Sequence, residues 1–187
     1  MKSLREQFED DYAAVKIPAK NKAGFKIRYV YYAPWYIWNL PEPVLKRKKL
    51  LLTCISVGNL FLFILAGVQE TGLNHHKAVE LTVIFALCTH VLELFSIVQF
   101  LFANYMTSRM TYSYINKTLK SMPFIRGFCL LATVMASIYY TLQNELHFRT
   151  FMIAICYLIC ALMALYVFWE YRKIPFKTEK NIKIIGR

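Results

Sequence analysis

Four apolar runs, each of about 20 residues, constrain the fold of this chain more than any other feature, because that length lets a helix cross a bilayer. They cover roughly Leu50–Val68, Val79–Ala103, Phe124–Leu142 and Phe148–Trp169. Within lipid, a helix satisfies all of its backbone polar groups internally. The composition fits this interpretation, since 57% of the residues are hydrophobic and only 18% are charged. The sequence therefore predicts an all-α integral membrane protein, a bundle of four transmembrane helices.

Basic residues are distributed unequally between the segments outside these runs. The segment up to Lys49 holds 11 Lys and Arg, and the tail after Trp169 holds six. The second connection holds four, counting Arg126 at its edge, whereas the first and third hold one each. Lys and Arg concentrate on the cytoplasmic side of membrane proteins. We therefore expect a multi-pass protein of the cell membrane with both termini in the cytoplasm, and a net charge of +12 that reflects topology rather than nucleic-acid binding.

The same boundaries divide the chain into three parts. Residues 1–49 are expected to form a cytoplasmic amphipathic and interfacial segment, residues 50–170 the bundle, and residues 171–187 a basic cytoplasmic tail. Near the N-terminus, apolar residues recur at helical spacing and predict a short amphipathic helix that packs on the bundle or docks on a partner protein. The residues of that face are Leu4, Phe8, Tyr12 and Val15.

Two further features of the first segment suggest contact with the membrane surface. Seven of the fourteen residues in Phe25–Trp38 are aromatic, and Trp and Tyr favour the headgroup level. We expect this stretch to lie flat on the inner surface, as a cap over the bundle or as a platform for lipid or substrate. The basic cluster that precedes the first run is expected to face and bind anionic lipid headgroups. It consists of Lys46, Arg47, Lys48 and Lys49.

Ionisable residues within the second run suggest a functional site. His90 and Glu93 are three residues apart and therefore share one helical face. An ionisable side chain at membrane depth is costly and indicates function by default. Polar residues on the first and third runs fall at a similar depth. The expected cluster comprises Asn59, His90, Glu93, Thr133 and Ser137.

Three interpretations of this cluster remain open. It stabilises the bundle through hydrogen bonds between helices, or Glu93 carries protons with His90 as its modulator, or the cluster serves redox or metal chemistry. A bis-histidine haem needs a second His at matching depth, and His147 lies at the outer end of the fourth run. The outer loops offer weaker candidates for metal ligands, namely His75, His76 and His147. We expect no cofactor, since no cofactor-binding motif or C-x-x-C pair is present.

The general shape resembles small four-span bacterial membrane proteins, including small drug exporters and disulfide-forming enzymes. The exporters carry their acidic residue in the first span, whereas Glu93 lies in the second run; the disulfide-forming enzymes carry cysteines in outer loops that here have none. The leading hypothesis is a non-enzymatic accessory or assembly subunit that contacts membrane lipids and either further copies of itself or other membrane subunits. The alternatives are an oligomeric proton-coupled transporter that uses Glu93 and His90, and an intramembrane enzyme acting on a lipid or quinone.

Overall fold

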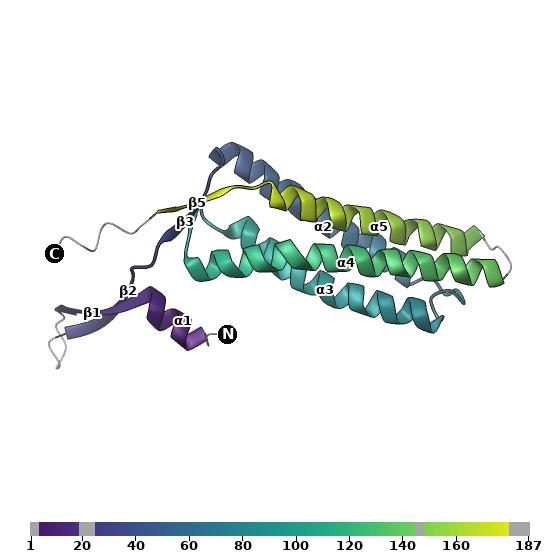
Figure 1. Ribbon diagram of the computed structural model, residues 1–187, viewed down its shortest axis with the longest axis horizontal. Helices are drawn as coiled ribbons and strands as arrows, with labels where there is room; N and C mark the ends of the chain where they lie inside the picture. The colour runs from purple at the N-terminus through teal and green to yellow at the C-terminus, as the bar shows by residue number, and fades with distance from the viewer. Residues whose placement is uncertain (1–3, 19–24, 145–147, 180–187) are drawn as a thin grey trace.

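A computed structural model of the chain describes residues 4–18, 25–144 and 148–179. Four long helices lie side by side and form an elongated bundle (Figure 1). All four are long and apolar enough to cross a membrane, which confirms the prediction of four candidate spans. They are α2 (Glu42–Gly67), α3 (Lys77–Phe102), α4 (Arg109–Gln143) and α5 (Phe148–Arg172).

Two of the helices begin well before their apolar runs. α2 starts at Glu42, so the basic cluster forms part of this helix rather than a segment that precedes it. α4 starts at Arg109, where the side chain of Ser108 caps it by accepting a hydrogen bond from the Thr111 amide. At about 1.5 Å per residue, its 35 residues exceed the length needed to cross the hydrocarbon core. As a consequence, Arg126 lies in the middle of α4 and not at the edge of a connection.

Small residues allow α4 and α5 to approach each other closely. A Cβ atom added at Gly127 would lie 2.8 Å from the side chain of Leu165 and 3.6 Å from the carbonyl oxygen of Ala161. Ala161 and Ala164 are themselves fully buried on α5. Membrane helices depend on such small residues because lipid gives no hydrophobic drive for association. Large apolar side chains point outward instead, among them Phe61 and Leu142.

The chain is mostly helical, as expected, but it is not all-α, because segments outside the bundle form β-structure. The short helix α1 (Leu4–Asp11) leads into an antiparallel hairpin of β1 (Tyr12–Pro18) and β2 (Phe25–Tyr31). The helical face expected to continue through Tyr12 and Val15 therefore ends early. Apolar and polar residues alternate along β2, and this period of two favours a strand over a helix.

A second sheet joins three distant segments at one end of the bundle. Its strands are β3 (Trp35–Trp38), β4 (Met106–Thr107) and β5 (Phe176–Glu179), in the order β4-β3-β5. Trp38 is 2% exposed and makes an edge contact with Phe100 at a ring-centroid distance of 5.1 Å. The stretch Phe25–Trp38, expected to lie flat on the membrane, is thus divided between two strands, the second of which packs on the bundle.

Candidate functional site

Six polar side chains from three helices lie fully buried about midway along the bundle, and we call them the polar layer. They divide the core into two apolar clusters along the bundle axis. The cluster nearer the sheet includes Trp38, Phe100 and Leu119, and the cluster nearer the opposite end includes Phe63 and Leu130. The polar layer comprises Ser56 and Asn59 on α2, His90, Glu93 and Ser96 on α3, and Arg126 on α4.

An ion pair lies at the centre of the polar layer. Arg126 Nη2 is 3.2 Å from Glu93 Oε1, and neither side chain has any exposed surface. Ser56 Oγ donates a hydrogen bond of 3.0 Å to the same carboxylate oxygen. The pair therefore connects α3 to α4, and the serine adds α2. In a low-dielectric interior, a charged side chain is stable only when it is paired and hydrogen-bonded. The ion pair and the hydrogen bond from Ser56 provide these interactions for Glu93.

Arg126 is the one charged member of the layer that was not among the expected site residues. The sequence placed it at the cytoplasmic edge of the third run, where basic residues are common. Arg126 and Thr133 are seven residues apart and therefore lie on similar sides of a helix. This spacing was the one feature of the sequence that could have indicated an interior position for Arg126. The interior position of this arginine became evident only from the structure, in which α4 begins well before the apolar run.

His90 and Asn59 complete the layer through contacts with backbone groups. His90 Nε2 lies 3.3 Å from the carbonyl oxygen of Ser56. Asn59 Nδ2 donates to the carbonyl oxygen of Cys160 at 2.8 Å, which connects α2 to α5. The structure thus brings three of the expected residues, Asn59, His90 and Glu93, into one layer.

Thr133 and Ser137 are buried but bond elsewhere. Thr133 Oγ1 is 2.9 Å from Thr82 Oγ1 on α3, and it also donates to the carbonyl oxygen of Cys129. Ser137 Oγ donates to the carbonyl oxygen of Thr133 at 2.7 Å. Thr133 therefore connects α4 to α3 beyond the polar layer, whereas the hydrogen bond of Ser137 lies within α4.

Several atoms of the polar layer have no hydrogen-bond partner within the described part of the chain. They include Glu93 Oε2, His90 Nδ1, Ser96 Oγ and the Nε and Nη1 atoms of Arg126. Unpaired polar atoms are expensive in an apolar interior. The layer consequently has spare capacity for hydrogen bonds, and its carboxylate and imidazole are groups able to exchange protons.

The expected basic cluster contributes mainly to internal contacts. Lys46 pairs with Glu42 at 2.7 Å, and Lys48 pairs with Glu170 of α5 at 2.8 Å. Lys49 is buried, donates to the carbonyl oxygen of Ala103 just past the end of α3, and lies over the ring of Phe100. At this position the Lys49 ammonium satisfies a free carbonyl group at the C-terminal end of α3. Lys46 and Arg47 are the exposed members.

The histidine candidates for metal binding do not assemble into a site in the described residues. No group of three or more His, Cys, Asp or Glu there could hold a metal ion. His75 and His76 lie in the connection between α2 and α3, where the ring of His76 contacts that of Tyr140. His147 lies outside the described residues.

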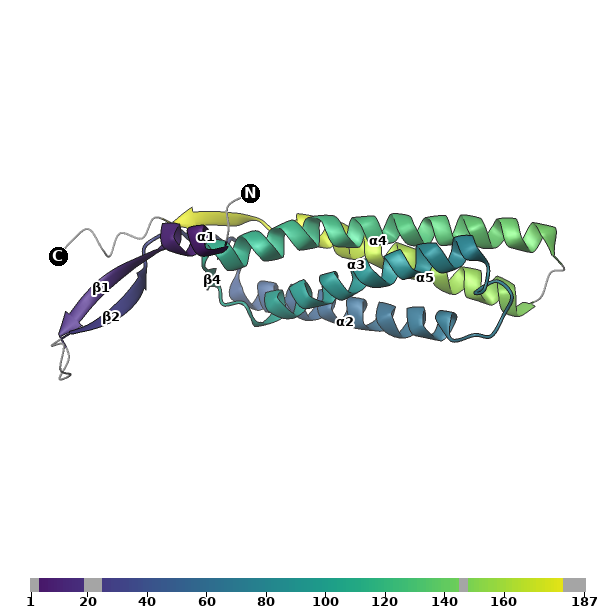
Figure 2. The ribbon, with the colours of Figure 1, turned by 90° about the horizontal axis from the view of Figure 1, so that it is seen from below.

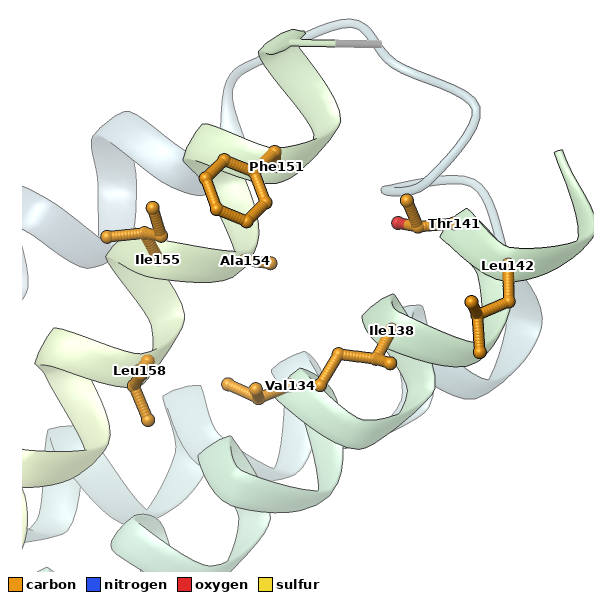
Figure 3. Close-up of a pocket in the computed structure, with 8 residues that line it drawn as sticks. All are labelled: Val134, Ile138, Thr141, Leu142, Phe151, Ala154, Ile155 and Leu158. Carbon is orange, nitrogen blue, oxygen red and sulfur yellow. The ribbon is translucent and has the colours of Figure 1, made fainter. Parts of the chain in front are cut away.

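A groove between α4 and α5 offers space near the end of the bundle opposite the sheet (Figure 3). Its volume is about 310 Å³, and apolar side chains such as Ile138, Phe151 and Leu158 line it. Among the described residues that line the groove, Thr141 is the polar one and none is titratable. None of them belongs to the polar layer.

The hairpin forms a second candidate site, and it extends past the end of the bundle (Figure 2). From Ala14 to Pro18 and from Phe25 to Tyr29, every residue is exposed. Tyr31 anchors its base by donating to the carbonyl oxygen of Pro34 and accepting from the Arg109 amide, both at 2.8 Å. Burial raises the pKa of this phenol, which keeps it protonated for both roles.

Comparison of the chain with protein-family models, with curated proteins and with solved structures finds no match.

Proposed function

We propose that this protein is a non-enzymatic subunit of a membrane complex and that it binds a partner protein through its hairpin. The observation that carries the proposal is the exposure of apolar side chains on both faces of a two-stranded ribbon. Val15, Ile17, Ile27 and Tyr29 are all exposed. Exposed apolar surface of this kind marks an interaction site.

The stability of the hairpin supports the same proposal. An isolated two-stranded hairpin is at best marginally stable in water, and a third strand or a packing surface is needed to stabilise it. In the described part of the chain, β1 and β2 pair with each other alone. Tyr31 and an ion pair of 3.7 Å between Asp11 and Arg109 hold its base. A partner that covers the hairpin would add a further packing surface. In the topology we propose, it lies in the cytoplasm, where the bias in Lys and Arg places both termini.

Co-purification tests this proposal. We expect a protein at fixed stoichiometry to accompany the chain after gentle extraction from native membranes. Replacing Ile17 and Ile27 with serine should release it, because these exposed side chains contribute apolar contact area. Tyr114→Ser is the matched control, since Tyr114 is an exposed apolar residue on α4, away from the hairpin. A chain that purifies alone, or a partner that remains bound to the Ile17→Ser/Ile27→Ser variant, would contradict the proposal.

A second candidate function is proton-coupled transport, and the polar layer favours it. Oε2 of Glu93 has no hydrogen-bond partner among the residues that the structure describes, and His90 and Arg126 lie in the same layer. Protonation of Glu93 would dissolve the ion pair and leave the arginine free to rearrange. Such a change in pairing is the kind of two-state element that a transporter requires.

Infrared spectroscopy distinguishes this candidate from a purely structural ion pair. If Glu93 exchanges protons during function, a protonated-carboxyl band should appear as the pH of reconstituted protein is lowered from 8 to 5, and Glu93→Gln should abolish it. Glu80→Gln is the control, since Glu80 is an exposed residue of the same helix. A spectrum in which Glu93→Gln removes no band would leave the ion pair with a structural role.

A further inference from the structure

A polar cavity lies at the end of the bundle opposite the sheet, and we call it the end pocket. It is formed by the connection between α2 and α3 and by the neighbouring ends of α4 and α5. Its volume is about 520 Å³, and none of its described residues belongs to the polar layer. The described residues that line it include Glu70 and Gly72 from the connection, Tyr140 and Asn144 from the end of α4, and Arg149 and Thr150 from the start of α5.

The connection between α2 and α3 is held against the end of α2 by Asn74. Its Nδ2 atom donates to the carbonyl oxygen of Ala66 at 2.9 Å and to that of Gln69 at 2.8 Å. Gly72 then packs so closely against Tyr140 that an added Cβ atom would overlap the phenol oxygen. These internal contacts fix one wall of the end pocket without the help of a ligand.

Two opposite charges line the end pocket. Glu70 supplies a carboxylate and Arg149 a guanidinium, and neither forms an ion pair in the part of the chain that the structure describes. A guanidinium group binds phosphate through two parallel hydrogen bonds. A carboxylate accepts hydrogen bonds from an ammonium group, which has three donors. A ligand that carries both a phosphate and a primary ammonium group therefore complements the two side chains.

The end pocket lies at the level expected for lipid headgroups. The apolar runs of α4 and α5 end at Leu142 and Phe148, and Asn144 and Arg149 lie within two residues of these ends. The headgroup region borders the hydrocarbon core of a bilayer directly. A phospholipid consequently presents its phosphate and its ammonium group at the depth of the end pocket.

The apolar groove between α4 and α5 extends from the same end of the bundle toward the membrane interior (Figure 3). Thr141 and Phe151, which line the groove, directly follow Tyr140 and Thr150, which line the end pocket. Along α4 the groove continues to Val134, seven residues or about 10 Å deeper. A headgroup site and an apolar groove at acyl-chain depth are thus built on the same two helices.

We propose that the end pocket and the groove together bind one zwitterionic phospholipid with a primary ammonium headgroup, such as phosphatidylethanolamine. Arg149 binds the phosphate, Glu70 binds the ammonium group, and one acyl chain lies in the groove. A choline headgroup fits less well, because it has no N–H group to donate to Glu70. Quaternary ammonium groups are bound by cages of several aromatic rings, whereas Tyr140 is the single aromatic residue among the described residues of the end pocket.

Native mass spectrometry of the full chain, released from detergent micelles, tests the inference. The probe is dioctanoyl phosphatidylethanolamine, and phosphatidylcholine and phosphatidylglycerol with the same acyl chains are the comparisons. We expect one phosphatidylethanolamine per chain, bound about tenfold or more tightly than the other two lipids, which corresponds to about 1.4 kcal/mol. Equal binding of the three lipids would overturn the inference, because it would show that the headgroup is not recognised.

A soluble headgroup distinguishes a membrane lipid from a free zwitterion. Glycerophosphoethanolamine has the same phosphate and ammonium groups but no acyl chain, so it should compete only weakly with the dioctanoyl lipid. Competition at equal concentration would show that the end pocket binds a soluble zwitterion and that the assignment to a lipid is wrong.

Substitution of the two charged residues locates the headgroup. Arg149→Gln and Glu70→Gln should each weaken binding about tenfold, and Arg149→Lys should give an intermediate loss because lysine keeps the charge without the planar fork. The matched controls are Lys77→Gln and Glu80→Gln, which make the same charge changes at exposed positions of α3 at the same end of the bundle. An equal loss in these controls, or no loss in Arg149→Gln and Glu70→Gln, would contradict the inference.

Filling the groove tests the position of the acyl chain. Ala154 lines the groove, so Ala154→Phe should occupy it and weaken binding of the dioctanoyl lipid. Ala132→Phe adds the same ring at an exposed position of α4 that does not line the groove, and it should leave binding unchanged. Equal binding by the two variants would show that the acyl chain lies outside the groove, and the inference would be wrong.

Discussion

Replacing Arg126 with leucine is expected to lower the free energy of unfolding by about 3–5 kcal/mol. The substitution leaves the Glu93 carboxylate buried without its counter-ion, with Ser56 Oγ as its remaining hydrogen-bond donor. A carboxylate in that position loses its hydration without regaining an equivalent interaction. The measurement is a denaturant-driven unfolding titration of the purified protein in mixed micelles.

The double variant Glu93→Leu/Arg126→Leu should recover most of that loss. Removing both charges leaves no uncompensated ion, and buried ion pairs are often replaced by apolar residues at little cost. Lys120→Leu controls for the loss of a basic residue from α4, since Lys120 is exposed. We expect it to change stability by less than about 0.5 kcal/mol. A double variant as unstable as Arg126→Leu would show that the layer contributes more than the ion pair.

Replacing Trp38 with alanine is expected to destabilise the protein by about 3–5 kcal/mol. Trp38 is fully packed, and its ring contacts those of Phe100 on α3 and Tyr112 on α4. Loss of the indole would leave a cavity between the β4-β3-β5 sheet and the end of the bundle. We therefore expect both a lower unfolding midpoint and faster tryptic cleavage at the exposed Lys173, which precedes β5.

Trp169→Ala is the matched control for this prediction. Trp169 is 66% exposed on α5, so its loss removes little buried contact area. Trp38→Phe should give an intermediate effect, because a smaller ring retains part of the contact with Phe100. Equal destabilisation by Trp38→Ala and Trp169→Ala would mean that the sheet does not depend on Trp38 for its attachment.

The helices of the bundle could be predicted from the sequence, but the three-stranded sheet could not. Apolar runs identify membrane helices because their length and composition are sufficient signals. The strands β3, β4 and β5 are two to four residues long and come from three distant parts of the chain. Segments that short carry too few residues to show a period, and their pairing depends on contacts that no local pattern records. The aromatic content of Phe25–Trp38 therefore suggested an interfacial segment.

For the polar layer too, some residues could be predicted from the sequence and others could not. Helical spacing placed His90 and Glu93 on one face, and estimates of depth brought Asn59 near them. Thr133 and Ser137 were expected in the same cluster, yet they bond to Thr82 and to the backbone of α4. Position along the helix axis decides such contacts. The apolar run has its middle near Thr133, whereas α4 extends from Arg109 to Gln143 and has its middle at Arg126.

The sequence by itself determined that the chain has four helices able to span a membrane, and that His90 and Glu93 lie inside one of them. Only the tertiary structure decided which charge pairs with Glu93, because Arg126 lies 33 residues further along the chain and had a plausible role at the membrane edge. It likewise revealed the antiparallel hairpin of β1 and β2. Hydropathy is a local property that the sequence contains directly, whereas pairing of charges and strands depends on the three-dimensional packing of distant segments.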